Sequence, residues 1–145
     1  MSIDDRAAAL EQEFAQFGEW LDKYNYLIEL GKSVPSIDPQ FRTDSYLIRG
    51  CQSRVWLHAR LEDAVIRYSA DSDAVITRGI ASMLIRVLDG QPPDAVMGAD
   101  LSFIDRIGLK EHLSPTRSNG LLAMLKQMKL YAYAFQAREK AGGKS

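Results

Sequence analysis

One short part of this chain alternates apolar and polar side chains at a period of two, and apolar residues at helical spacing flank it on both sides. Valine, leucine and alanine occupy the odd positions from 55 to 61, which is typical of a strand with one buried face. Residues 65–68 form a second such run after the polar pair Glu62-Asp63, so an antiparallel hairpin is predicted, with residues 46–48 as a third strand. A small antiparallel β-sheet needs helices to cover its apolar face, which indicates an α+β fold.

The first helices are predicted from apolar residues that recur three or four positions apart between residues 4 and 30. Gly18 is expected to divide this stretch into two helices or to bend it. Another helix is predicted over residues 74–88, with the oxygens of residues 71–73 as candidate caps. Gly79 lies inside this helix and costs about 1 kcal/mol relative to alanine. We therefore expect close packing or a nearby backbone at that position.

The rest of the chain is also predicted to be helical. Short helices are predicted at 92–98 and 102–108, because each begins with a start signal and ends at a glycine. A long helix is expected to begin at Ser114, and its predicted apolar face comprises Leu121, Leu122, Leu125, Met128, Ala132 and Phe135. No linker interrupts these elements, so residues 1–140 are predicted to form a single domain, with 141–145 as a disordered tail.

Composition argues against several classes of protein. The 145 residues carry 18 Lys and Arg against 19 Asp and Glu, so no global field favours nucleic acid or an anionic membrane. The N-terminal residues do not resemble a secretory leader, and no segment has the pattern of a membrane span. Together with a single cysteine, these features predict a cytoplasmic protein. One cysteine and two scattered histidines also fall short of a metal site.

The single cysteine, Cys51, lies within Arg49-Gly50-Cys51-Gln52-Ser53-Arg54, directly before the predicted strand. A glycine at this junction can turn the backbone and present the thiol at a loop tip. The flanking arginines favour the thiolate, whereas apolar neighbours oppose it by desolvation, and the sequence leaves this balance open. His58 and His112 are the two histidines that could act as a base beside the thiol.

Several segments, in the same order along the chain, resemble the SufE family of sulfur-acceptor proteins, also described as the Fe–S metabolism associated domain. The matching segments are Tyr26-Leu27-Ile28-Glu29-Leu30-Gly31, Gly50-Cys51-Gln52-Ser53 with Val55-Trp56, Asp71-Ser72-Asp73-Ala74, Gly79, and His112-Leu113-Ser114-Pro115-Thr116-Arg117 through Gly120. They cover about residues 10 to 135. The resemblance implies an α+β fold like that of IscU-type scaffolds. Those scaffolds use several cysteines, so a single Cys51 favours a sulfur carrier over a cluster builder.

The resemblance further implies that Cys51 accepts persulfide sulfur from a PLP-dependent cysteine desulfurase of the SufS or CsdA type. The acceptor would stimulate that enzyme without being a complete enzyme itself. It would deliver the sulfur to an iron–sulfur scaffold of the SufBCD type in the SUF system. No cofactor is implied for this chain, because the PLP belongs to the desulfurase. The SufE-like and CsdE-like branches of the family are not distinguished.

By the same comparison, Gly50, Gln52 and Ser53 belong to the cysteine loop, while Asp73 and Arg117 fall at positions associated with loop placement and partner docking. Arg117 is expected to favour the sulfur anion or bind the partner, and Asp73 to hold the loop at rest. Two other classes stay open: an adaptor that docks without using its thiol, and a small thiol hydrolase with a histidine base. A homodimer through the long amphipathic faces also stays open.

Overall fold

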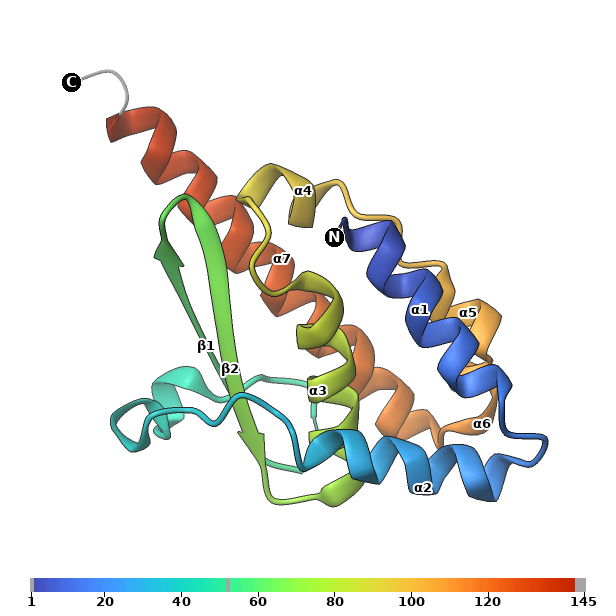
Figure 1. Cartoon of the computed structure of the whole chain (residues 1–145). Coiled ribbons are helices and arrows are strands. Elements are labelled where there is room, and N and C mark those ends of the chain that lie inside the picture. Colours follow the sequence, from blue (N-terminus) through green and yellow to red (C-terminus); the bar gives the residue numbers. More distant parts are fainter. Residues whose placement is uncertain (1, 52, 143–145) are drawn as a thin grey trace.

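The computed structural model describes residues 2–51 and 53–142, with side chains described through Glu139. These residues form a two-stranded antiparallel sheet, seven α-helices and two short 3₁₀ helices, which confirms the predicted α+β class (Figure 1). The elements are α1 (Ile3–Ala15), α2 (Trp20–Gly31), η1 (Pro39–Phe41), η2 (Asp44–Tyr46), β1 (Val55–Glu62), β2 (Val65–Ser72), α3 (Val75–Leu88), α4 (Pro93–Met97), α5 (Phe103–Ile107), α6 (Leu109–His112) and α7 (Pro115–Gly142).

The β1–β2 hairpin forms as predicted, with Val55 opposite Ser72 and Glu62 opposite Val65. Its turn places Asp63 and Ala64 at φ values of 52° and 67°, the left-handed conformation that a two-residue hairpin turn requires. The predicted third strand at residues 46–48 is wrong. Residues 44–46 form η2 instead, and Leu47 alone makes an isolated bridge to Trp56. The chain turns away at Gly50, so this segment is too short to build a ladder.

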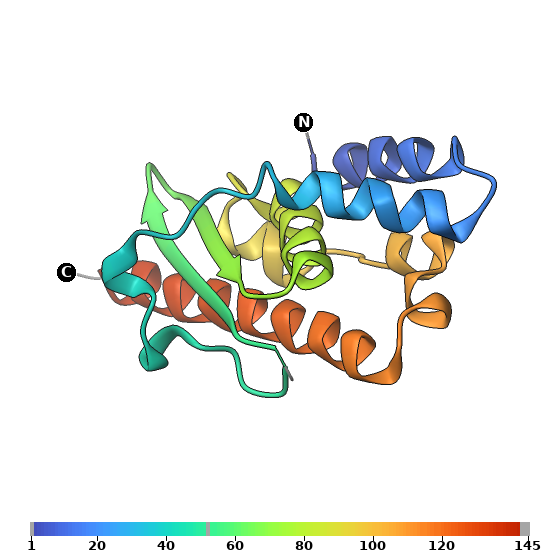
Figure 2. The same cartoon turned by 90° about the horizontal axis from the view of Figure 1, so that it is seen from below.

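Helix α3 is the centre of the fold and packs against β2, α1, α2 and α7. In both views it lies between the hairpin on one side and the α1–α2 pair on the other, with the long α7 running beside it (Figures 1 and 2). Its apolar side chains are buried on nearly all sides, including Ile80, Met83 and Leu84. A Cβ atom at Gly79 would lie 2.2 Å from the carbonyl oxygen of Leu27. The predicted close packing at Gly79 is therefore confirmed, and α2 is its partner.

Helix ends agree with the sequence in some places and differ in others. Helices α1 and α2 are separated at Gly18, as predicted, and α2 ends at Gly31. The N-cap of α3 is Ala74, which makes no side-chain cap, so the predicted capping by residues 71–73 is wrong. β2 continues to Ser72, so these residues make other contacts: Asp71 pairs with Arg78, Asp73 accepts from the Arg54 N–H, and Ser72 Oγ accepts from the N–H of Ala74 itself. Helix α7 extends through Gly142, beyond the predicted boundary at 140, and residues 143–145 lie outside the described part of the chain.

Two further differences concern the C-terminal third. Helix α6 lies between α5 and α7 and was not expected as a separate element. In α7, Leu121, Met128 and Ala132 are buried as predicted, but the Leu122 residue is 46% exposed. Leu122 follows Leu121 by one residue, so it lies about 100° further round the helix, away from the core. Across the described residues, no helix is long and apolar enough to cross a membrane.

Candidate functional site

The Cys51 loop comprises residues 49–54 between η2 and β1. The backbone N–H of Ile48 donates to the carbonyl of Val55 at 2.9 Å, so the two ends of the loop are joined. Gly50 has a φ of 93°, a left-handed value that side chains other than glycine rarely tolerate. The sequence prediction of a glycine turn beside the thiol is therefore confirmed. Gln52, which the sequence placed in the same site, lies outside the described residues.

The Cys51 thiol is half-buried against the first turns of α7. Its Sγ lies 3.7 Å from the carbonyl oxygen of Gly120, within reach of a weak S–H···O hydrogen bond. Burial raises the pKa of the Cys51 thiol, because the less polar surroundings disfavour the thiolate. In this conformation, desolvation of the thiolate therefore outweighs the stabilising effect of the flanking arginines, a comparison that the sequence left open. The two flanking arginines are exposed to solvent, where their influence is screened.

Several hydrogen bonds hold the C-terminal half of the loop against α3 and the residues just before it, including one from Ser72 Oγ to the Arg54 carbonyl at 2.8 Å. The hydroxyl oxygens of Ser53 and Thr77 lie 3.1 Å apart, and Thr77 is buried at 6% exposure. The backbone N–H of Arg54 donates to Oδ1 of Asp73 at 3.0 Å, and the N–H of Asp73 donates back to the Arg54 carbonyl at 3.3 Å. Asp73 is therefore a loop contact rather than a helix cap. These bonds are consistent with the expected role of Asp73 in loop placement.

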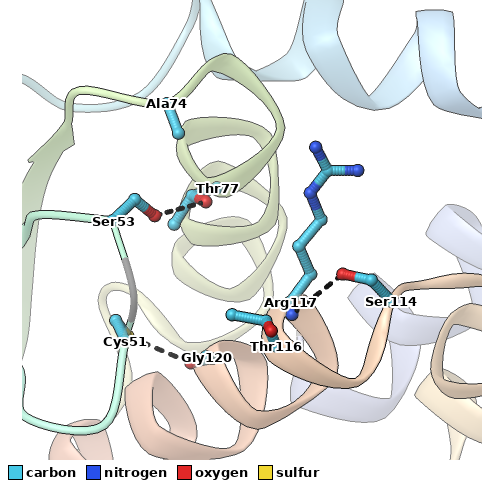
Figure 3. A pocket seen from close by; sticks show the side chains of 8 residues that line it. All are labelled: Cys51, Ser53, Ala74, Thr77, Ser114, Thr116, Arg117 and Gly120. Atoms are coloured by element: carbon cyan, nitrogen blue, oxygen red, sulfur yellow. Dashed lines mark hydrogen bonds between the residues drawn. The ribbon is translucent and has the colours of Figure 1, made fainter.

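A cavity of about 530 Å³ opens beside the thiol. It lies between the Cys51 loop, the start of α3 and the start of α7, and Figure 3 shows its lining side chains. The described lining residues are Cys51, Ser53, Ala74, Thr77, Ser114, Thr116, Arg117 and Gly120. Four of these carry hydroxyl groups and one is cationic, whereas none of them is acidic. We call this space the thiol cavity. A second hollow of about 320 Å³ shares Cys51 and Ser53 with this cavity, and its other lining residues are Asp44, Leu47, Ile48, Arg49 and Arg54.

Arg117 contributes to the thiol cavity from the first turn of α7. Its backbone N–H donates to the Ser114 hydroxyl at 3.3 Å, as in a capped helix start. Its guanidinium extends along the cavity on the side away from Cys51 and is exposed (Figure 3). Among the described residues, no carboxylate forms an ion pair with it. The structure therefore places a cation beside the thiol cavity but not against the resting sulfur.

The two histidines lie in other surroundings. The His58 ring stacks on Phe41 at a centroid distance of 3.7 Å, and the His112 ring stacks on Trp20 at 3.9 Å. Neither histidine lines the thiol cavity. The thiol-hydrolase hypothesis thus finds no histidine base beside Cys51. Within residues 2–51 and 53–142, no group of three or more Cys, His, Asp and Glu side chains could hold a metal ion.

Comparison with known proteins identifies the family. Residues 8–132 match the SufE family, described as the Fe–S metabolism associated domain. The chain belongs to the SufE family. An uncharacterised SufE-like protein of Rhizobium meliloti is 38% identical over 122 residues, which cover 81% of this chain and 87% of that protein. A similar protein of Rhizobium etli is 35% identical over 130 residues, which cover 84% of this chain and 88% of that protein.

Two further matches differ in what they indicate. The SufE-like protein 1 of Arabidopsis thaliana, whose name places it in chloroplasts and mitochondria, is 38% identical over 117 residues. The match covers 80% of this chain but only 32% of that longer protein. The solution structure of a hypothetical protein from Thermus thermophilus superimposes with a TM-score of 0.74. It covers 89% of this chain and 94% of that one at 24% identity, so this likeness concerns the fold alone.

Sequence reasoning missed Thr77 as part of the surroundings of the Cys51 loop. The available signal was a threonine four residues after Asp73, in the first turn of a predicted helix that is mostly apolar. Ser114, Thr116 and Gly120 did appear in the segments that resemble the family, but no contact with Cys51 was assigned to them. Their position beside the same cavity, and the contact of Gly120 with Cys51, depend on how α7 lies against α3, which periodicity along one helix does not determine.

Proposed function

We propose that this SufE-family protein accepts persulfide sulfur on Cys51 from a PLP-dependent cysteine desulfurase of the SufS or CsdA type. It would stimulate that enzyme by removing its sulfur, and deliver the sulfur to an iron–sulfur scaffold of the SufBCD type. The observation that carries the proposal is the position of Cys51, half-buried at a glycine turn beside a polar cavity. The family's association with Fe–S metabolism supports the same conclusion.

The transfer needs one thiol and no general base from this chain. The Cys51 thiolate attacks the outer, sulfane sulfur of the donor persulfide, forming a new S–S bond as the donor S–S bond breaks. The donor cysteine leaves as a thiolate, and Cys51 retains the transferred sulfur as a persulfide. Atoms and electrons balance without an external oxidant or reductant. The reaction is the persulfide counterpart of thiol–disulfide exchange.

The resting loop is poorly suited to attack, and this suggests a role for docking. Burial raises the pKa of the Cys51 thiol, so less thiolate is present at rest than on an exposed cysteine. Release of the loop contacts to Thr77 and Asp73 would expose the sulfur and lower its pKa toward the ordinary value. We therefore propose that the desulfurase selects a released loop conformation. The closed conformation would then shelter the persulfide from oxidation.

Arg117 and Asp73 have separate roles in this proposal. Arg117 lies exposed beside the thiol cavity, where it would contact an anionic sulfur or the docked desulfurase. Replacing Arg117 by alanine should reduce stimulation of the desulfurase, and unchanged stimulation would remove this role. Asp73 holds the backbone of Arg54, so Asp73→Arg should increase loop mobility and alter transfer. If Asp73→Arg leaves both loop mobility and sulfur transfer unaltered, Asp73 does not position the loop.

The deciding experiment is intact mass spectrometry after incubation with a cysteine desulfurase, PLP and L-cysteine. The wild-type protein should gain the mass of one sulfur atom, and a reductant should remove it. The Cys51→Ser variant should gain none, while the desulfurase is shown to carry its own persulfide. If wild-type protein also gains no sulfur, the carrier function is refuted. A Cys51→Ser variant that still stimulates the desulfurase would instead support the adaptor function.

A further inference from the structure

The thiol cavity is much larger than the transferred atom requires. One added sulfur atom needs about the space of one water molecule, roughly 30 Å³. The cavity measures about 530 Å³. Volumes of about 300 to 1,000 Å³ are typical of sites that take small organic molecules. Shelter for a persulfide therefore accounts for only a small part of this space.

The lining of the thiol cavity has a charge preference. No carboxylate among the described lining residues neutralises the Arg117 guanidinium. Hydroxyl groups of Ser114 and Thr116 lie on the same helix start, and those of Ser53 and Thr77 lie toward the loop. A guanidinium forms two parallel hydrogen bonds to a carboxylate, and such charge-assisted bonds are the stronger ones in proteins. The cavity is therefore suited to a small anion with further polar groups.

The Cys51 thiol and the Arg117 guanidinium lie on different sides of the thiol cavity. Figure 3 shows the Cys51 side chain on the loop side of the cavity and the Arg117 guanidinium extending on the other side. A ligand that spans them would carry sulfur at one end and a carboxylate at the other. A cysteine residue within a protein chain has no free carboxylate, whereas a small-molecule thiol can carry one. The persulfide of a free amino acid therefore supplies both groups within one small molecule, without a second residue from a partner.

We propose that the thiol cavity binds low-molecular-weight thiol persulfides that carry a carboxylate, such as the persulfide of free L-cysteine, and that they charge Cys51 without the desulfurase. This inference rests on the proposed chemistry at Cys51 and adds a second class of donor. The Cys51 thiolate attacks the sulfane sulfur of R–S–SH, a new S–S bond forms, and R–S⁻ leaves. Attack on the inner sulfur would instead produce a mixed disulfide and hydrosulfide. The two products differ in mass by the R group.

The test uses the full chain and two donors, the persulfides of L-cysteine and of L-cysteine methyl ester, which lacks the carboxylate charge. Each charging rate is followed by intact mass spectrometry and divided by the rate of the same donor with a small thiol free in solution. This division removes differences in intrinsic donor reactivity. The wild-type protein should favour the carboxylate donor about tenfold, as expected for a charge-assisted pair that is partly exposed.

Two arginine variants test whether Arg117 causes the preference for the carboxylate donor. Arg117→Gln should reduce the donor ratio to about one by slowing the carboxylate donor alone. Arg49→Gln is the matched control, because Arg49 is also an exposed arginine near Cys51 but lines the second hollow. Arg49→Gln should keep the wild-type ratio between the two donors. The inference is overturned if wild-type protein charges equally with both donors, if Arg117→Gln keeps the preference, or if Arg49→Gln removes it.

A parallel arm separates this inference from the proposed function. The same protein is charged by a cysteine desulfurase with L-cysteine as substrate. Charging by the desulfurase but not by the small persulfides would refute the second donor class and leave the carrier function intact. Charging by the small persulfides but not by the desulfurase would refute the proposed donor enzyme instead. A mixed disulfide as the product of the carboxylate donor would overturn the proposed direction of attack.

Discussion

Thr77→Val should loosen the Cys51 loop without disrupting the core. The substitution preserves the shape of a side chain that is 6% exposed but removes the hydroxyl that lies 3.1 Å from Ser53 Oγ. A neutral hydrogen bond of this kind contributes about 1 kcal/mol, so its loss should raise the population of the released loop about fivefold. Alkylation of Cys51 by iodoacetamide through the released loop should accelerate by the same factor.

The assay measures the alkylation rate as a function of pH for the wild-type protein, Thr77→Val and Thr77→Ser. Thr77→Ser retains the hydroxyl and is the matched control, so its rate should stay close to that of the wild-type protein. In Thr77→Val the apparent pKa of Cys51 should also fall toward the ordinary thiol value, because burial is the cause of its elevation. Denaturant unfolding of each variant shows whether global stability has changed.

Equal alkylation rates in the wild-type protein and Thr77→Val, with equal global stability, would refute the reasoning. The Ser53–Thr77 contact would then contribute nothing to loop closure. Acceleration in Thr77→Ser as large as in Thr77→Val would also contradict it. In that case the methyl group of Thr77, rather than its hydroxyl, would restrain the loop.

Three further predictions concern stability. Gly79→Ala should lower the free energy of unfolding by about 2 kcal/mol in denaturant titration, because the new methyl group would clash with the Leu27 carbonyl. At an unpacked helix position the same change stabilises by about 1 kcal/mol. A gain of that size would refute the close contact. Glu13→Gln should cost about 1 kcal/mol near neutral pH, because Arg86 donates to Glu13 and lowers its pKa. Since that pKa is depressed on folding, the difference from the wild-type protein should disappear as the pH falls through the folded-state value, and a pH-independent difference would contradict it. The Cys51 pKa is raised on folding, so wild-type stability relative to Cys51→Ser should decrease as the pH rises above the ordinary thiol pKa, whereas a constant or increasing difference would exclude burial as the cause.

Local pattern predicted most of the elements. The period-two run predicted β1, and Gly18 predicted the break between α1 and α2. The wrong predictions occurred where the polar groups of one segment could form hydrogen bonds with more than one partner. Residues 46–48 had strand-like composition but formed a turn and a bridge, and Asp73 had capping chemistry but bound the loop backbone of Arg54. Tertiary contacts decided both cases.

The sequence by itself determined that one thiol follows a glycine at the start of a hairpin, and that helices must cover that hairpin. These are properties of neighbouring residues, because backbone preference and side-chain periodicity act over a few positions. Only the tertiary structure decided the depth of Cys51 and its neighbours. Thr77 and Gly120 lie 26 and 69 positions after Cys51, and they meet the loop because α3 and α7 pack side by side against the same core. Burial of the thiol, and hence its raised pKa, depends on that packing and on no local signal.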